Sequence, residues 1–140
     1  MPLVANKALA RRANGVFASG NGENFDDIFA ADYVNHQEAD VSAGRADRSL
    51  AEYQEMLGVF HSVFSNARSE VLMQVAEGDL VATRWRFTAL LTGEYRDVGP
   101  MDDEVSWTGV QIDRIADGKV AESWDEWDKY GLFAQMGLIE

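Results

Sequence analysis

The chain of 140 residues has no cysteine and only two histidines, His36 and His61. Without cysteine it can form no disulfide, no thiolate nucleophile and no thiolate metal site. A metal site would need oxygen ligands together with one of the histidines. The adjacent carboxylates of residues 102–104 have no histidine beside them in the sequence and are typical of a solvated loop. We therefore expect no bound metal.

Basic residues and long apolar runs are also scarce. Lys and Arg number 12 against 24 Asp and Glu, which gives a formal charge of -12. A field of this sign repels phosphate backbones and anionic lipid headgroups, so nucleic acid is not an expected partner. No apolar run approaches the roughly 20 residues that span a bilayer. Residues 1–12 also lack the apolar stretch of a signal peptide. We expect a cytoplasmic protein that does not bind membranes.

The remaining composition is typical of one globular domain. Hydrophobic residues make up 46% of the chain and charged residues 26%, as in ordinary folded proteins. A chain of 140 residues can bury one core, so we assign residues 1–140 to a single domain. Four Trp, four Tyr and seven Phe are many for this length. Aromatic side chains line apolar ligand pockets as readily as they fill cores, so a cavity is possible.

Apolar residues recur at helical spacing in the first half of the chain. Residues 3–17 predict a helix that ends at the glycine-rich residues 20–22. Asn24 is suited to cap a short helix in which Phe25, Ile28 and Phe29 share one face. Residues 32–36 then lead into a loop.

A second, longer helix is predicted after the loop of residues 37–44. It begins at Ala46 or Asp47 and carries one apolar stripe at three- and four-residue spacing. The stripe consists of Leu50, Tyr53, Met56, Leu57, Phe60, Val63 and Phe64.

The apolar period changes to two in the second half, which predicts antiparallel strands over 71–76, 80–91, 105–115 and 120–127. A last helix is predicted over residues 129–136. Helices that precede antiparallel strands define an α+β fold, in which we expect the N-terminal helices to cover the concave face of a curved, mostly antiparallel sheet. The expected shape is a cone.

The facing of the last two strands depends on the turn at residues 116–119. A three-residue turn with Gly118 in the left-handed conformation would place Arg114 opposite Val120 and Ile112 opposite Glu122. The face predicted to point inward then carries Val110, Ile112, Arg114, Val120, Glu122, Trp124, Glu126 and Asp128. The other face, predicted to serve a partner subunit, carries Trp107, Gln111, Asp113, Ser123, Asp125 and Trp127. A two-residue turn at residues 117–118 would change this pairing.

Several segments resemble a known family in their order and spacing. They read DYVNH at 32–36, FSNAR at 64–68, EGDLVATRW at 77–85, TGE at 92–94, DRIADGKV at 113–120 and ESW at 122–124. Asp128, Gly131-Leu132 and residues 135–137 continue the pattern. Together they resemble the SnoaL-like polyketide cyclases, within the nuclear transport factor 2-like superfamily.

The resemblance implies ring closure by intramolecular aldol condensation, without metal or organic cofactor. It also implies a carboxylate acid/base near the end of the last strand, which by position is Asp128. Asp128 precedes the last helix, so it is equally suited to cap that helix. Some of these cyclases carry a histidine where this chain has Arg114, which cannot give up its proton but can stabilise an enolate.

Further candidate residues have structural alternatives. His36 is a candidate for proton transfer or for a hydrogen bond to a loop carbonyl. Arg114 and Glu122 are candidates for a buried ion pair. Candidates for substrate binding are Tyr33, Tyr53, Trp85, Glu122 and Trp124, although aromatic residues on sheets usually serve packing.

Two functions follow from these residues. The first is a cofactor-independent acid/base enzyme that cyclises, isomerises or dehydrates an apolar carbonyl compound. The second is a non-catalytic module of the same fold that binds an apolar small molecule or a partner chain. In either case we expect a homodimer or larger homo-oligomer, because the fold leaves one side of its sheet uncovered.

Overall fold

The computed structural model describes residues 2–19, 25–37 and 47–139. Its helices are α1 (Pro2–Ser19), α2 (Phe25–Ile28), α3 (Leu50–Val63) and α4 (Lys129–Gln135). Its strands are β1 (Phe29–Gln37), β2 (Asp47–Ser49), β3 (Phe64–Glu77), β4 (Leu80–Leu91), β5 (Glu104–Ala116) and β6 (Lys119–Trp127). The six strands form one sheet in the order β2-β1-β6-β5-β4-β3.

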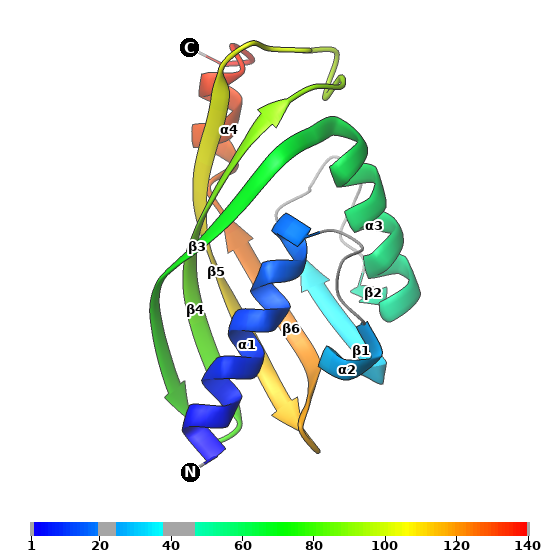
Figure 1. Ribbon diagram of the computed structural model, residues 1–140, viewed down its shortest axis with the longest axis vertical. Helices are drawn as coiled ribbons and strands as arrows, with labels where there is room; N and C mark the ends of the chain where they lie inside the picture. The colour runs from blue at the N-terminus through cyan, green and yellow to red at the C-terminus, as the bar shows by residue number, and fades with distance from the viewer. Residues whose placement is uncertain (1, 20–24, 38–46, 140) are drawn as a thin grey trace.

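The sheet is curved and mostly antiparallel, with a single parallel pair formed by β1 and β6 among the described strands. Figure 1 shows α1 and α3 on the same side of this sheet, and α4 beyond the end of β6. The predicted α+β fold with N-terminal helices against a curved sheet is confirmed.

Helix α3 begins later than predicted because of its cap. The Ser49 hydroxyl accepts a hydrogen bond from the Glu52 backbone N–H, and the Glu52 carboxylate accepts one from the Ser49 N–H. This reciprocal capping box fixes the first helical residue at Leu50. Asp47 instead belongs to β2, and Ala46 lies outside the described residues. The predicted Asn24 cap, the 20–22 helix stop and most of the 37–44 loop lie outside them as well.

Strand β4 has the predicted bounds, and β5 and β6 differ from prediction by one residue at each changed end. Strand β3 extends well beyond the prediction, and β1 lies where no strand was predicted. β3 starts directly after α3 at Phe64, through a polar stretch that has little apolar alternation. β1 was not predicted, because its strand conformation depends on pairing with β6, a partner more than 80 residues away. Such tertiary pairing leaves no local pattern.

The turn between β5 and β6 has two residues, so the predicted three-residue turn is wrong. Asp117 and Gly118 both have positive φ, 53° and 75°, as in the two-residue hairpin turn that matches strand twist. Ile115 then pairs with Val120, and Arg114 pairs with Glu122. Ala121 is the extra residue of a β-bulge. The predicted pairing of Arg114 with Val120 is therefore wrong.

The predicted facing of these strands is inverted, except at Val120, which lies before the bulge and is buried as predicted. Val110 and Ile112 lie on the outer face, 38% and 37% exposed. The buried face, which α1 and α3 cover, instead carries the polar residues Gln111, Asp113, Ser123 and Asp125, together with Trp107. Gln111 and Ser123 donate hydrogen bonds to Asp113, and Asn35 donates one to Asp125, which also borders a pocket, so these polar side chains are tolerated inside. Trp107 and Trp127 consequently do not form the predicted surface for a partner subunit.

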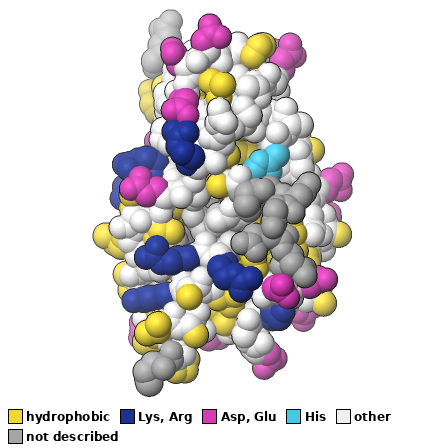
Figure 2. Space-filling model, in the orientation of Figure 1, with side chains coloured by type: hydrophobic (Ala, Val, Ile, Leu, Met, Phe, Trp, Pro, Cys, Tyr) yellow, Lys and Arg dark blue, Asp and Glu magenta, His cyan; other side chains and the backbone are white. Residues whose placement is uncertain are grey.

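Two clusters of buried side chains form the core. The first lies under α1 and α2 and includes Ala10, Val16, Ile28, Phe29, Tyr33, Tyr53 and Leu57. The second lies toward α4 and includes Phe64, Trp85, Phe87, Trp107, Leu132 and Met136. Gly109 belongs to this second region, because a Cβ there would collide with the Trp85 indole and the Glu126 carbonyl. On the helix side of the molecule, Figure 2 shows Lys and Arg gathered near α1 and acidic side chains spread around the edge.

Candidate active site

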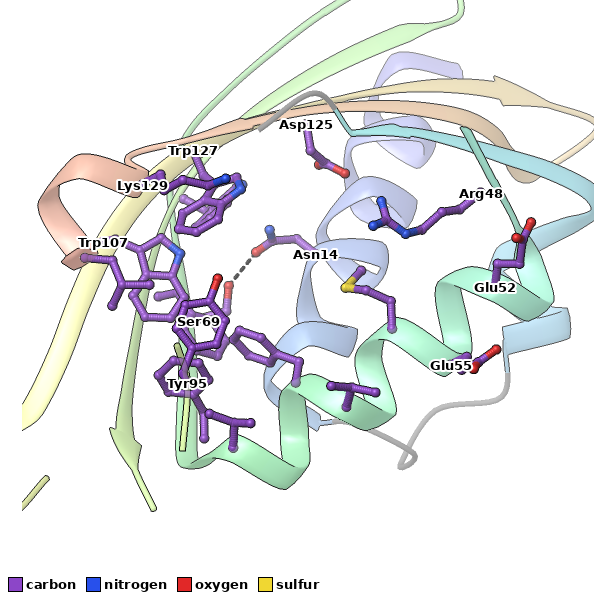
Figure 3. Close-up of a pocket in the computed structure, with 18 of the residues that line it drawn as sticks. Asn14, Arg48, Glu52, Glu55, Ser69, Tyr95, Trp107, Asp125, Trp127 and Lys129 are labelled. Atoms are coloured by element: carbon purple, nitrogen blue, oxygen red, sulfur yellow. Dashed lines mark hydrogen bonds between the residues drawn. The ribbon is translucent and has the colours of Figure 1, made fainter. Parts of the chain in front are cut away.

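A pocket of about 530 Å³ lies between the helices and the concave face of the sheet. Seven of the residues that line it are aromatic, namely Phe60, Phe64, Trp85, Phe87, Tyr95, Trp107 and Trp127. Figure 3 shows Asn14, Ser69, Asp125 and Trp127 around this pocket, contributed by α1, β3 and β6. An apolar wall with a few polar groups is the usual form of a small-molecule site.

Asp125 is the buried acid of the pocket, with only 5% of its surface exposed. Burial raises the pKa of its carboxyl to about 6, because a charged carboxylate loses hydration inside the protein. The Asn35 Nδ2 group opposes this shift by donating a 2.8 Å hydrogen bond to Asp125 Oδ2. Asp125 Oδ1 has no hydrogen-bond partner among the described residues. The carboxyl can therefore exchange a proton near neutral pH.

A second buried acid lies behind Asp125. Asp113 Oδ1 accepts hydrogen bonds from Ser123 Oγ at 2.5 Å and from Gln111 Nε2 at 2.8 Å. Burial is the main cause that raises the pKa of Asp113 to about 7, and the nearby Asp125 charge adds to it. Asp113 does not line the pocket. The Asp125 charge therefore acts on Asp113, which does not itself reach a ligand.

Tyr33 extends this interior network, and the Tyr53 ring packs against the Tyr33 ring with centres 5.5 Å apart. Asn35 Nδ2 also donates a 3.1 Å hydrogen bond to the Tyr33 hydroxyl oxygen. Burial raises the pKa values of Tyr33 and Tyr53 well above their ordinary values, so both phenols stay protonated at neutral pH. Tyr33 and Tyr53 were predicted to bind substrate, but both side chains lie in the first core cluster and neither lines the pocket.

Two cations line the pocket. Arg48 on β2 lines the pocket, and its charge lowers the pKa of Asp125, although less than burial raises it. Lys129, at the start of α4, has its Nζ 5.7 Å from the centre of the Trp127 ring. Figure 3 shows Arg48 and Lys129 on opposite sides of the pocket. The pocket wall is thus apolar in the middle and charged on two sides.

The structure brings four of the predicted site residues together, but outside the pocket. His36 Nε2 lies 2.6 Å from Glu122 Oε2, and Arg114 Nε donates to Glu122 Oε1 at 3.0 Å. The His36 ring stacks on Trp124, with ring centres 5.3 Å apart. None of these four residues lines the pocket. The predicted Arg114–Glu122 pair is confirmed, and its predicted inward position is wrong.

His36 also contacts Asp47 on β2. Its Nδ1 lies 2.8 Å from Asp47 Oδ1, so each ring nitrogen faces a carboxylate. Partial burial lowers the pKa of His36, but the hydrogen bonds to Glu122 and Asp47 outweigh it, and the pKa is raised overall. These contacts favour the charged imidazolium, which is a structural tie between β1, β2 and β6.

Of the two remaining predicted site residues, Asp128 lies outside the pocket and Trp85 lies at it. Asp128 is exposed and caps α4, where its Oδ1 accepts a 2.8 Å hydrogen bond from the Gly131 N–H. This geometry is the helix cap that the sequence allowed as an alternative. Trp85 lines the pocket, as expected of a residue that binds substrate.

Sequence reasoning missed Asp113, Asp125 and Asn14. Asp113 alternates with apolar Ile112 on β5, and Asp125 follows Trp124 on β6, so both aspartates suggested a solvent-facing side of the strands. One signal pointed the other way. Val105, Trp107 and Ile115 share the odd-numbered face of β5 with Asp113, and all three are buried.

Within residues 2–19, 25–37 and 47–139, no cluster of three or more His, Asp or Glu is arranged to hold a metal ion. In the same residues, no helix is both long enough and apolar enough to cross a membrane.

The fold and the pocket define a class, a small α+β domain that encloses an apolar cavity with a buried carboxylate. Within this class, the model of the SnoaL-like polyketide cyclase family matches residues 7–136. The chain belongs to this family.

Solved structures agree with this assignment. The candidate hydroxylase AclR from Streptomyces galilaeus is 27% identical, with a TM-score of 0.85 over 99% of this chain and 88% of AclR. The candidate polyketide cyclase IdmH from Streptomyces antibioticus is 25% identical, with a TM-score of 0.83 over 94% of this chain and 98% of IdmH. TsrD from Streptomyces laurentii, at 20% identity, shares the fold with a TM-score of 0.80 over 97% of each chain. Among curated protein sequences, none matches this chain.

Proposed function

We propose that this protein catalyses proton transfer on an apolar carbonyl compound without a cofactor, with Asp125 as the acid/base. The observation that carries the proposal is the Asp125 carboxyl itself. It lies at an aromatic pocket, its pKa is raised to about 6, and its Oδ1 has no hydrogen-bond partner among the described residues. This role replaces the one that the sequence suggested for Asp128, which is engaged as a helix cap.

The proposed reaction begins when the Asp125 carboxylate removes a proton from a carbon beside a carbonyl group. The electrons of the C–H bond form the C=C bond of an enolate, and the carbonyl oxygen takes the negative charge. In an aldol ring closure, the enolate carbon then attacks a second carbonyl group of the same molecule. The new C–C bond restores the first carbonyl, and the second oxygen takes the proton back from Asp125. Isomerisation and dehydration begin with the same proton removal.

The pocket wall supports a flat, apolar substrate. Its seven aromatic residues offer faces and edges to a ring system, and pockets of roughly 300–1,000 Å³ accommodate drug-sized ligands. The same wall would serve the alternative function, a module that binds an apolar molecule without chemistry. Asp125 favours the enzyme, because an ionisable carboxyl buried beside an apolar ligand destabilises binding unless it has a chemical role.

The test uses 2-tetralone, a bicyclic ketone with exchangeable α-protons, in deuterium oxide. We expect the wild-type protein to accelerate exchange of the C1 protons, as followed by proton NMR, and the rate to rise with pH through about 6. Asp125→Asn should lower the accelerated rate by about 100-fold or more. Asp128→Asn is the matched control and should keep the wild-type rate.

The same experiment separates the two functions. A wild-type protein that binds 2-tetralone without accelerating exchange would favour the binding module. Equal exchange rates in the wild type and Asp125→Asn would exclude Asp125 as the base.

For the assembly, we propose a cytoplasmic homodimer that pairs the outer faces of two sheets. One row across this face consists of Arg84, Val110 and Glu126, on β4, β5 and β6. A two-fold axis parallel to β5 above Val110 would lay each Arg84 over the partner's Glu126, with apolar Val110 and Ile112 between them. The self-complementary charge pattern supports a second copy of the chain as the partner.

A further inference from the structure

Asn14 is a polar residue in an unusual place. It lies near the C-terminal end of α1, is only 2% exposed, and follows the buried apolar Ala13. Asn is a poor helix former, and burying its amide costs free energy unless hydrogen bonds replace those to water. Its position therefore needs an explanation beyond helix formation.

The Asn14 side chain is held by one hydrogen bond. The Ser69 hydroxyl on β3 donates to Asn14 Oδ1 at 2.5 Å, the contact marked by a dashed line in Figure 3. This distance is at the short end of the range for an O–H···O bond and below the range for an N–H···O bond, which assigns the oxygen of the amide to Ser69. The Nδ2 group is consequently on the other side of the amide.

The Nδ2 group is directed to the pocket. Asn14 lines the pocket together with Asp125, and Figure 3 shows its amide projecting from α1 into the space between Ser69 and Asp125. No described residue accepts a hydrogen bond from Nδ2, and this atom is not among the fully buried polar atoms that lack a partner. A fixed N–H donor thus lies in the pocket wall, together with Asp125 and the seven aromatic residues.

We infer that Asn14 is a further catalytic residue, whose Nδ2–H donates a hydrogen bond to the substrate carbonyl that becomes the enolate oxygen. The inference rests on the proposed function, because the enolate forms only if Asp125 removes the neighbouring proton. A donor held in place before the reaction stabilises the developing negative charge without reorganising. Ser69 is the positioning residue, since it keeps the amide nitrogen turned toward the pocket.

The ligand chemistry follows from this pair of groups. Asp125 supplies a carboxylate that accepts a proton, and Asn14 supplies a donor that binds an oxygen on the adjacent carbon. A ketone or 1,3-dicarbonyl compound on a flat ring system presents this combination. A hydrocarbon of the same shape lacks the oxygen and should gain nothing from Asn14.

The experiment compares 2-tetralone with 2-methylenetetralin, in which a CH2 group replaces the carbonyl oxygen. We expect Asn14→Leu to raise the Kd of 2-tetralone by roughly 3- to 10-fold, the effect of one lost hydrogen bond. The Kd of 2-methylenetetralin should not change. The infrared carbonyl stretch of bound 2-tetralone should be lowered in the wild type and in Asp125→Asn, and should rise in Asn14→Leu. Ser69→Ala should change both readouts in the same direction by less.

A matched control addresses a purely structural role. Gln74 on β3 also ties α1 to the sheet, through a 3.0 Å hydrogen bond to the Lys7 carbonyl, and it does not line the pocket. Gln74→Leu should leave both Kd values and the carbonyl stretch unchanged. The inference is overturned if Asn14→Leu weakens ketone and hydrocarbon equally, or if the carbonyl stretch is the same in Asn14→Leu and the wild type.

The two proposals fail in different ways. If the carbonyl stretch depends on Asn14 but the wild type does not accelerate proton exchange, the proposed function fails and Asn14 is a ligand-binding donor only. If the proton-exchange rate depends on Asp125 but the carbonyl stretch does not change in Asn14→Leu, the enzyme proposal stands and this inference fails. A wild-type protein that binds neither compound would contradict both.

Discussion

Asp113 and Ser123 face each other across β5 and β6, and the Ser123 hydroxyl donates a 2.5 Å hydrogen bond to Asp113 Oδ1. The pair is fully buried under the helices, on the same face of the sheet as Asp125. Two carboxyls are therefore buried in one polar network, and burial raises the pKa of each. Their titration should be visible in the stability of the protein.

The first prediction concerns pH. A carboxyl whose pKa is higher in the folded state than in the unfolded state makes the folded state bind more protons, so stability falls as pH rises. For Asp113 and Asp125 the stability should fall between about pH 4 and about pH 7, the range between their ordinary and folded pKa values. Asp113→Asn should reduce this fall by on the order of 2–4 kcal/mol. Urea denaturation at several pH values measures it.

The exposed residue Asp103 supplies the control, because Asp103→Asn should leave the pH dependence as in the wild type. Identical curves for the wild type and Asp113→Asn would show that Asp113 does not titrate in this range.

The second prediction concerns the cap of α4. Asp128→Ala removes the hydrogen bond to the Gly131 N–H and should lower the free energy of unfolding by about 1 kcal/mol. Asp128→Asn should cost less than about half of that, because Asn is a similarly good cap. Thermal unfolding of the three proteins gives the comparison. A loss of turnover in Asp128→Asn at unchanged stability would return the acid/base role to Asp128.

The third prediction concerns Arg114 and Glu122. If the pair were buried, removing one partner would lower the free energy of unfolding by about 3–5 kcal/mol. Here the side chains are 37% and 26% exposed on the outer face, so solvent screens the pair. We expect a coupling energy of about 1 kcal/mol or less in a double-mutant cycle of Arg114→Met and Glu122→Gln. Coupling well above this value would mean that a partner subunit covers the outer face.

The fourth prediction tests that assembly. Ile112→Arg places two like charges at the centre of the proposed interface and should convert the dimer to a monomer, without unfolding a residue that is already 37% exposed. Sedimentation velocity measures the change. Val4→Arg, a substitution of a 73% exposed residue on α1 at the helix side of the sheet, is a charge-matched control and should leave the mass unchanged. A wild-type protein that is monomeric at tens of micromolar, a concentration that populates a typical interface, would exclude the dimer.

The fold was predictable from the sequence to a larger extent than the site. Helix α1 and strands β4, β5 and β6 follow from local periodicity, which depends only on neighbouring residues. β1 has no such pattern, because it is ordered by its distant partner β6. The site depends on which side of β5 and β6 faces the helices, and alternation alone does not distinguish the two sides.

The polar site is the reason why the facing was misjudged. On β5 the larger apolar residues Val110 and Ile112 alternate with Gln111 and Asp113, which favours the wrong side. A pocket for chemistry needs buried polar groups, and an interface needs exposed apolar ones. Both features work against the rule that apolar residues point inward.

Because of the bulge at Ala121, strand β6, which bears Asp125, has one residue more than its pairing with β5 requires. Val120 pairs with Ile115 on one side of the bulge, and Glu122 pairs with Arg114 on the other. Deleting Ala121 would straighten β6 and leave both pairings in place, so Asp125 would still face the pocket. Deleting one residue between Glu122 and Asp125 would instead turn the carboxylate to the outer face. Strand β6 therefore tolerates the deletion of a residue at Ala121 and not between Glu122 and Asp125.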